Sequence, residues 1–228
     1  MLQILRITLL ILLVLWVLGQ VRKPTGPLGR RVLQAMNRAH ATVTDWGLQH
    51  LRFENNATIL DIGCGGGRTV QRLATLAPAG AVYGIDYSAV SVAASRQTNA
   101  REIEAGRVHI QLGSVAALPF PNGTFDVVTA VETHYYWPDL PANIGEVLRV
   151  LKPGGTFAII AETYRGARFG VLHGVVMRVL LHAAYLSDAE HRDLLTGAGF
   201  TDVTTTHEPG TSWICAVGRR PATARPGG

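Results

Sequence analysis

Cysteine, aromatic residues and long runs of one charge are all scarce in this chain. Only two of its 228 residues are cysteine, and 7% are aromatic. Cys64 and Cys215 are too few and too far apart for a disulfide framework or a metal site, so we expect two reduced thiols and no bound metal. The net charge of +5 could serve a membrane surface or a nucleic acid. No nucleic-acid-binding motif accompanies it, so we expect no nucleic acid partner.

Two familiar nucleotide-binding signatures are also missing. A dinucleotide fingerprint reads G-x-G-x-x-G, but Arg68 stands where the last glycine would be, and the G-K-[ST] of a phosphate-binding loop is absent. What is present is Asp61, two residues before the glycines at 63 and 65–67, in an apolar run that starts at Thr58. A strand followed by a glycine turn and a helix builds a nucleotide pocket at the strand's carboxyl end. A structural glycine turn and an altered dinucleotide site stay open as alternatives.

The N-terminal 21 residues form a long apolar run, interrupted mainly by Gln3 and Arg6. We expect a helix that just reaches the roughly 17–20 residues needed to span a bilayer, with Arg6 extending toward the head groups. Trp16 could lie near a membrane interface. More basic residues follow the run than precede it, which predicts a single-pass anchor in the cell membrane with the remainder on the cytoplasmic side. A secretory signal and a helix lying on the membrane are the alternatives.

The remainder of the chain separates by composition and periodicity. We expect an N-terminal anchor helix at 1–21, a linker and helical segment at 22–57, an α/β domain at 58–218 and a flexible tail at 219–228. In the second part, the pattern from Gly29 to Phe53 is helical. It places Met36 and His40 on one helix face.

The α/β domain alternates strand and helix patterns and ends in a hairpin. The first strand starts at Thr58, and the others cover residues 81–86, 107–112, 125–131, 156–161, 202–208 and 212–218. The expected helices cover residues 69–77, 89–104, 139–148, 169–185 and a segment that starts at a capping box of Ser187 and Glu190. This order predicts a doubly wound, mostly parallel seven-stranded sheet with helices on both faces, a Rossmann-like fold.

Asp86 closes the second expected strand, 25 residues after Asp61. A carboxylate at that strand end can accept hydrogen bonds from both ribose hydroxyls, which suits an adenosine ligand. An N-cap is the structural alternative for Asp86, but Ser88 is better placed to cap the helix that follows.

Four motifs in the same order resemble the class I S-adenosylmethionine-dependent methyltransferases, and their type 11 branch in particular. They are the acidic glycine loop from Asp61 to Gly67, the strand ending at Asp86, the Leu118-Pro119-Phe120 loop and the Lys152-Pro153-Gly154-Gly155 turn. The resemblance covers residues 58–218 and the helical segment before them. It implies S-adenosyl-L-methionine as the cofactor and transfer of its methyl group to a nucleophilic O, N, S or C atom.

The resemblance also implies which residues hold the cofactor. In the family the glycine loop packs against the methionine part, and the acid at the second strand's end binds the ribose. Many relatives carry Asp at the position of Ser114, so the adenine here meets an uncharged hydroxyl or relies on the Val115 backbone. The implied cofactor-binding residues are Asp61, Gly63, Cys64, Gly65, Gly67, Asp86, Tyr87, Ser114, Val115 and Glu132.

The run from Glu132 to Trp137 follows the fourth strand and combines an acid, a histidine and aromatic rings. His134 could accept a proton at neutral pH, and we predict His134 and Tyr135 as the catalytic residues. Tyr136, Trp137 and the earlier His40 are the predicted substrate residues, and the aromatic rings could stabilise a sulfonium. Packing in the core is the alternative for the aromatic residues, and a paired structural acid is the alternative for Glu132. A surface or packed histidine is the alternative for His40.

These observations predict a methyltransferase that acts on a small-molecule acceptor. A lipophilic acceptor is suggested by the expected anchor and by an apolar helix at 169–185. A general base is needed only if the acceptor arrives protonated. A catalytically idle, membrane-anchored module that binds S-adenosylmethionine is the first alternative, which Ser114 favours. A nicotinamide dehydrogenase is the second, which Arg68 and the terminal hairpin disfavour.

Overall fold

The computed structural model describes residues 22–167 and 183–222, together with Arg6, Thr8 and residues 16, 17, 19 and 20. Most of the expected anchor helix and of the expected helix at 169–185 lies outside these residues, as does the tail from residue 223. Within the described residues, no helix is both long and apolar enough to cross a membrane.

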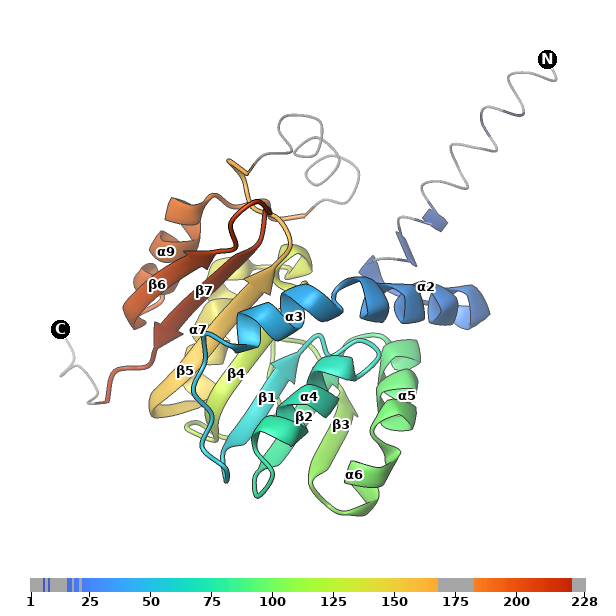
Figure 1. Cartoon of the computed structure of the whole chain (residues 1–228), viewed down its shortest axis with the longest axis horizontal. Helices are drawn as coiled ribbons and strands as arrows, with labels where there is room; N and C mark the ends of the chain where they lie inside the picture. The colour runs from blue at the N-terminus through green and yellow to red at the C-terminus, as the bar shows by residue number, and fades with distance from the viewer. Residues whose placement is uncertain are drawn as a thin grey trace.

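The described residues form one seven-stranded sheet with the order β3-β2-β1-β4-β5-β7-β6 (Figure 1). Neighbouring strands are parallel, except that β7 is antiparallel to both β5 and β6. The chain reverses its direction of winding between β1 and β4, where doubly wound sheets bind ligands. The predicted fold is therefore confirmed. The strands are β1 Thr58–Ile62, β2 Ala81–Asp86, β3 Val108–Leu112, β4 Phe125–Val131, β5 Leu151–Ala161, β6 Thr201–His207 and β7 Ile214–Arg219.

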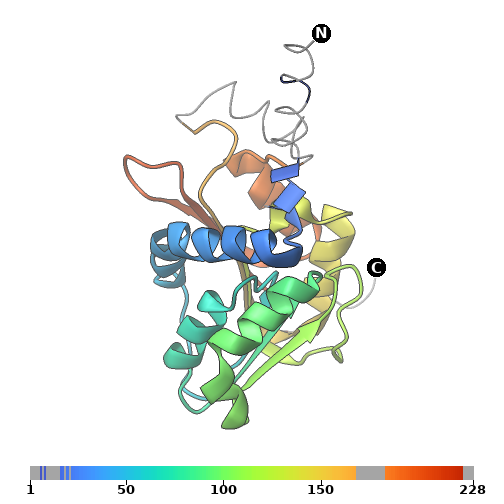
Figure 2. The same ribbon diagram turned by 90° about the vertical axis from the view of Figure 1, so that its right-hand side faces the viewer.

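Helices cover both faces of the sheet (Figures 1 and 2). On one face Val43 and Val70 join Ile59 in a core cluster, and on the other Ile144 joins Leu60. Ile59 and Leu60 are neighbours in β1 and both are fully buried, because successive side chains of a strand point to opposite faces. The helices are α2 Gly26–Ala39, α3 Ala41–Leu48, α4 Arg68–Leu76, α5 Ala89–Thr98, α6 Ala100–Glu104, the short 3₁₀ helix η1 His134–Tyr136, α7 Leu140–Val150 and α9 Asp188–Gly197.

Two expected helices are each divided where they meet the glycine loop or its cavity. The pattern at 29–53 forms α2 and α3, with a break at His40. The pattern at 89–104 forms α5 and α6, with a break at Asn99, whose side-chain amide donates to the carbonyl oxygen of Gly67. Tertiary contacts at these two positions therefore override a continuous helical pattern.

Two other boundaries also differ from those expected. β5 begins at Leu151 rather than at 156, so the Lys-Pro-Gly-Gly segment belongs to the strand, and its pairing with β4 skips from Leu151 to Thr156. Residues 183–185, expected to end a helix, have no regular structure. The capping box of Ser187 and Glu190 at the start of α9 is confirmed.

α2 and α3 lie end to end across the carboxyl-end edge of the sheet (Figures 1 and 2). α3 approaches β5 closely at Gly47, where an added Cβ would lie 2.5 Å from a side-chain carbon of Ile160. α2 extends from there toward α5, and Arg30 of α2 donates to the side-chain oxygen of Gln97, 2.8 Å away. The helical segment before β1 therefore covers the edge where the loops after β1, β2 and β4 meet.

Candidate functional site

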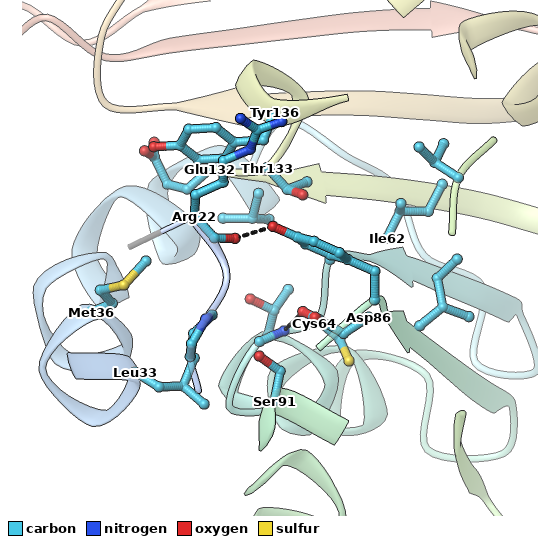
Figure 3. A pocket seen from close by; sticks show the side chains of 18 of the residues that line it. Arg22, Leu33, Met36, Ile62, Cys64, Asp86, Ser91, Glu132, Thr133 and Tyr136 are labelled. Carbon is cyan, nitrogen blue, oxygen red and sulfur yellow. Dashed lines mark hydrogen bonds between the residues drawn. The ribbon is translucent and has the colours of Figure 1, made fainter. Parts of the chain in front are cut away.

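A cavity of about 300 Å³ lies at the carboxyl ends of β1, β2 and β4, beneath α2 (Figure 3). Figure 3 shows Glu132, Thr133 and Tyr136 on one side of it and Cys64 and Asp86 on the other. Eleven residues proposed from the sequence line this cavity: His40, Gly63, Cys64, Gly65, Asp86, Tyr87, Ser114, Val115, Glu132, Tyr136 and Trp137.

The glycine loop is held against the end of β2 by its own backbone. The N–H groups of Gly63 and Cys64 both donate to the carbonyl oxygen of Ile85, at 2.8 and 2.9 Å. Gly63 has a φ of 74°, and a Cβ built on it would lie 2.1 Å from Oγ1 of Thr133. Only glycine therefore fits this position, because any side chain would be strained in φ and would collide with the loop after β4.

Asp86 lies where β2 ends and faces the glycine loop. Its Oδ2 accepts a hydrogen bond from Gly65 N at 3.0 Å, and its Oδ1 accepts one from Ser88 N at 2.8 Å. Burial raises the pKa of the Asp86 carboxyl, while these backbone donors act in the opposite direction. Ser88, not Asp86, caps α5 by accepting from Ser91 N. The carboxylate is thus positioned on the cavity wall rather than used as a helix cap.

A short strap from Arg22 to Pro24 closes the cavity over Asp86. The Tyr87 hydroxyl donates to the carbonyl oxygen of Arg22, an interaction drawn as a dashed line in Figure 3. The Ser88 hydroxyl donates to the carbonyl oxygen of Pro24 at 2.7 Å. The two residues that follow Asp86 therefore tie the N-terminal linker to this side of the cavity, a role that the composition of the linker did not reveal.

The helix α2 forms the roof directly above the glycine loop. A Cβ added to Gly66 would lie 2.0 Å from Nδ2 of Asn37, so the helix and loop are in close contact. Leu33 and Met36 also line the cavity from this helix, and His40 lines it at the junction with α3. Met36 and His40 therefore reach the same cavity, as their shared helix face implies.

Ser114 and Val115 follow β3 and line the cavity on the side away from β4. Ser114 is exposed, and its hydroxyl accepts a hydrogen bond from Ala116 N at 3.2 Å. Val115 is buried, with 6% of its surface accessible. At this corner, a flat ring could contact the Ser114 hydroxyl, the Val115 side chain and backbone groups.

Glu132 follows β4 in a left-handed conformation with a φ of 56°, which is uncommon for a residue with a side chain. Its Oε1 accepts a hydrogen bond from Glu162 N at the end of β5. Burial, and then the charge of Glu162, raise the pKa of Glu132 to about 8. Sequence reasoning did not single out Glu162. Glu162 directly follows β5, which is parallel to β4. Because parallel strands end at the same edge of a sheet, this position could have indicated that Glu162 lies near Glu132.

The structure does not place His134 and Tyr135 on the cavity wall, although we predicted them as the catalytic residues. His134 is fully buried, with its Nε2 3.4 Å from Nε2 of His191, and burial and His191 lower its pKa. The Tyr135 hydroxyl donates to the carbonyl oxygen of Thr163 at 3.1 Å. Both residues belong to η1, whose 3₁₀ turn directs successive side chains to different sides, so their rings are buried while the next residue, Tyr136, lines the cavity.

Asp61 and Gly67 also lie off the cavity wall. Asp61 is 2% exposed, and its Oδ1 accepts a hydrogen bond from the Thr129 hydroxyl at 2.7 Å. Burial raises the pKa of Asp61 to about 7. Gly67 lies at the start of α4, 2.9 Å from the side-chain nitrogen of Asn99. These two residues shape the loop from behind rather than line the pocket.

The arrangement fits an adenosine-containing cofactor. Asp86 can accept from ribose hydroxyls, Ser114 and Val115 form a corner that suits the base, and the glycine loop leaves room for the amino-acid end of such a molecule. Together with the order of the sheet, these features define the fold of the S-adenosylmethionine-dependent methyltransferases.

Comparisons with known proteins agree with this class. Residues 60–159 match the family model described as a methyltransferase domain. The chain is 37% identical over 112 residues to a demethylmenaquinone methyltransferase of Symbiobacterium thermophilum, a match that spans 49% of this chain and 45% of that protein. It is 30% identical over 186 residues to a 2-methyl-6-phytyl-1,4-hydroquinone methyltransferase of Synechocystis, spanning 77% of this chain and 56% of that protein. The chain thus spans about half the length of these relatives.

The fold is shared with solved structures. Human N-acetylserotonin methyltransferase, in complex with S-adenosylmethionine, superposes with a TM-score of 0.71 at 20% identity, covering 85% of this chain and 56% of that one. The chain belongs to the class I S-adenosylmethionine-dependent methyltransferases, and S-adenosylmethionine is the cofactor of that class.

Proposed function

We propose that this chain transfers the methyl group of S-adenosylmethionine to a small-molecule acceptor. The carrying observation is that one cavity is lined both by Asp86 with the glycine loop and by a second set of side chains, His40, Tyr136 and Trp137, from other elements. When bound, the cofactor supplies an electrophilic methyl group on a sulfonium, whose leaving group is a neutral thioether. The chain's own residues then have to bind, orient and exclude water.

The acceptor that best suits the cavity is lipophilic and carries an aromatic ring. Leu33 and Met36 of α2, together with Val131 and Trp137, give part of the cavity lining an apolar character. Relatives whose names refer to menaquinone and phytyl-hydroquinone substrates support the same class of acceptor. The apolar composition of residues 1–21 supports association with the cell membrane, with the catalytic domain on the cytoplasmic side.

The test uses the full chain in detergent. Calorimetric titration with S-adenosylmethionine, S-adenosylhomocysteine and NAD is expected to show binding of the first two only. Transfer of a labelled methyl group is then measured to prenylated hydroquinones and to the same rings without the tail, and we expect faster transfer to the prenylated set.

Three outcomes contradict parts of the proposal. Binding of NAD instead of S-adenosylmethionine overturns the cofactor. Binding of S-adenosylmethionine without transfer to any acceptor supports an idle binding module. Equal transfer to tailed and untailed rings removes the lipophilic acceptor but keeps the methyl transfer.

A further inference from the structure

Three titratable side chains from distant segments meet at one end of the cavity. His40 comes from the α2–α3 junction, Glu132 from the end of β4 and Glu162 from the end of β5. Their side-chain donor and acceptor atoms all lie within 4.8 Å of one another. His40 and Glu132 line the cavity, whereas Glu162 lies beside them and is not among the lining residues.

His40 lies next to a carboxylate that can stabilise its protonated form, as a general base requires. Its Nε2 lies 3.7 Å from Oε2 of Glu162, a distance at which the carboxylate stabilises an imidazolium. The His40 side chain is only 24% exposed, and burial lowers its pKa. The imidazole is therefore neutral at neutral pH and has a lone pair free to accept a proton.

Glu132 completes this arrangement as an acid. The Glu162 amide fixes one of its oxygens, and its pKa of about 8 keeps it protonated at neutral pH. Burial raises the pKa of Glu162 as well, but its side chain is 37% exposed, so Glu162 is the carboxyl of the pair that carries the negative charge beside His40. Glu132, on the cavity wall, can donate a hydrogen bond to an oxygen of the acceptor.

The other groups around this end of the cavity are less suited to take a proton. Tyr136 has a pKa raised to about 12, so its hydroxyl is a donor at neutral pH. Asp86 is engaged by two backbone amides at the opposite side. The other charged groups on the strap, α2 and α3 are Arg22, Lys23, Arg30, Arg31, Arg38 and Asp45, which pairs with Arg72 at 2.7 Å. Arg68 also lines the cavity, at the glycine loop.

We propose that His40, backed by the Glu162 carboxylate, is the general base of the methyl transfer, and that the acceptor is an aromatic hydroxyl that arrives protonated. This inference rests on the function proposed above. The acceptor's O–H bond breaks and its proton moves to the imidazole of His40. The freed electron pair of the oxygen forms the bond to the methyl carbon, while the carbon–sulfur bond breaks and its pair stays on sulfur.

The kinetic test compares His40→Gln and Glu162→Gln with His50→Gln, whose side chain is exposed and packs edge-on against Trp46 outside the cavity. Methyl transfer at pH 7 is measured to phenols that carry the same apolar tail but have ring substituents of increasing electron withdrawal. We expect His40→Gln to lower kcat by about 10²–10⁴-fold for the least acidic phenol, and Glu162→Gln by less. Both losses should shrink toward a nitrophenol that is already ionised, and the acid limb of the kcat/KM profile should disappear in His40→Gln.

Equal losses across the phenol series would show that His40 only positions the substrate, and this overturns the proposal. Activity that is lost to a chelator and restored by a divalent cation overturns it as well, since the three side chains would then hold a metal ion. S-adenosylhomocysteine binding is measured in parallel. If wild type and variants bind S-adenosylhomocysteine equally but His40→Gln keeps full activity, His40 is not the general base, while the proposed methyltransferase function stands.

A second measurement needs no acceptor. The nitrogen resonances of His40, assigned by their loss in His40→Gln, are titrated by NMR in the full chain. We expect Glu162→Gln to lower the pKa of His40, because the imidazolium loses its neighbouring negative charge, whereas His50→Gln leaves it unchanged. An unchanged His40 titration in Glu162→Gln rules out the pairing of these residues, whichever acceptor the enzyme uses.

Discussion

The two sides of the cavity are built by different means. The cofactor side, from Asp61 to Arg68 and at Asp86, is formed by backbone amides and glycines close together in the sequence. The side proposed to activate the acceptor has His40 and Glu132 on the cavity wall and Glu162 beside them, three side chains from distant segments. A short motif can encode backbone shape, but the pKa of a side chain depends on what the complete fold places around it. The four predictions below, in order of decreasing effect, test this difference.

Gly63→Ala should have the largest effect. Its new Cβ would lie 2.1 Å from Oγ1 of Thr133, so the loop must shift, and we expect S-adenosylhomocysteine to bind about 100-fold more weakly. Gly154→Ala is the matched control, since Gly154 has a similar φ of 77° but nothing within 4 Å of an added Cβ. Both variants should lose about 1 kcal/mol of stability from backbone strain. Calorimetry checks this, and comparable binding losses in both would contradict a role for the close contact.

Asp86→Asn tests the charged contribution on the cofactor side. The amide keeps the size of the carboxylate but loses its charge and half of its acceptor capacity, so we expect about 10–100-fold weaker binding of S-adenosylmethionine. Asp126→Asn is the control, because Asp126 pairs with Lys152 at 2.8 Å away from the cavity, and should leave the affinity unchanged. Equal affinities of wild type and Asp86→Asn by titration calorimetry would remove Asp86 from the cofactor contacts.

Glu132→Gln tests the acceptor side through stability. The folded pKa of Glu132, about 8, exceeds its usual value of 4.5, so the folded state retains a proton that the unfolded state loses over this range. The wild type should therefore lose stability as pH rises from 4.5 to 8, and Glu132→Gln should remove part of this loss, by about 1–3 kcal/mol at pH 8.5 relative to pH 5. Urea unfolding at both pH values measures it.

A second buried acid and a control variant help to interpret the unfolding data for Glu132→Gln. Asp61, with a pKa raised to about 7, contributes a loss of the same sign in the same pH range and remains in the variant, so some pH dependence should persist. Glu54→Gln, at an exposed position, is the control and should give the same difference from wild type at both pH values. If Glu132→Gln behaves like Glu54→Gln, then Glu132 is ionised in the folded protein.

Ser114→Asp should have the smallest effect and the opposite sign. A carboxylate here would replace a neutral acceptor with a charged one at the corner proposed to hold the adenine. We expect about 3–10-fold tighter binding of S-adenosylmethionine, consistent with one charge-assisted hydrogen bond at an exposed position. Thr211→Asp, in the exposed turn before β7, is the control and should leave the affinity unchanged. An unchanged dissociation constant would show that the adenine does not contact Ser114.

The loop after β4 shows where the sequence did not reveal which side chains line the cavity. Its composition indicated a functional segment, and Glu132, Tyr136 and Trp137 do line the cavity. Within the same six residues, His134 and Tyr135 are buried away from it. A short 3₁₀ turn sends neighbouring residues in different directions, and no hydrophobic period is long enough within three residues to reveal which side faces inward.

The sequence by itself determined the order of strands and helices, the class of the fold, and the side of the cavity made from the glycine loop and Asp86. These features depend on local patterns: apolar strands, glycines that allow a tight approach, and an acid at a strand end. Only the tertiary structure decided that His40, Glu132 and Glu162 share one end of the cavity, and that His134 is packed in the core. The physical reason is that burial and charge–charge proximity arise between residues far apart in the chain, and these two effects set which side chain can accept a proton.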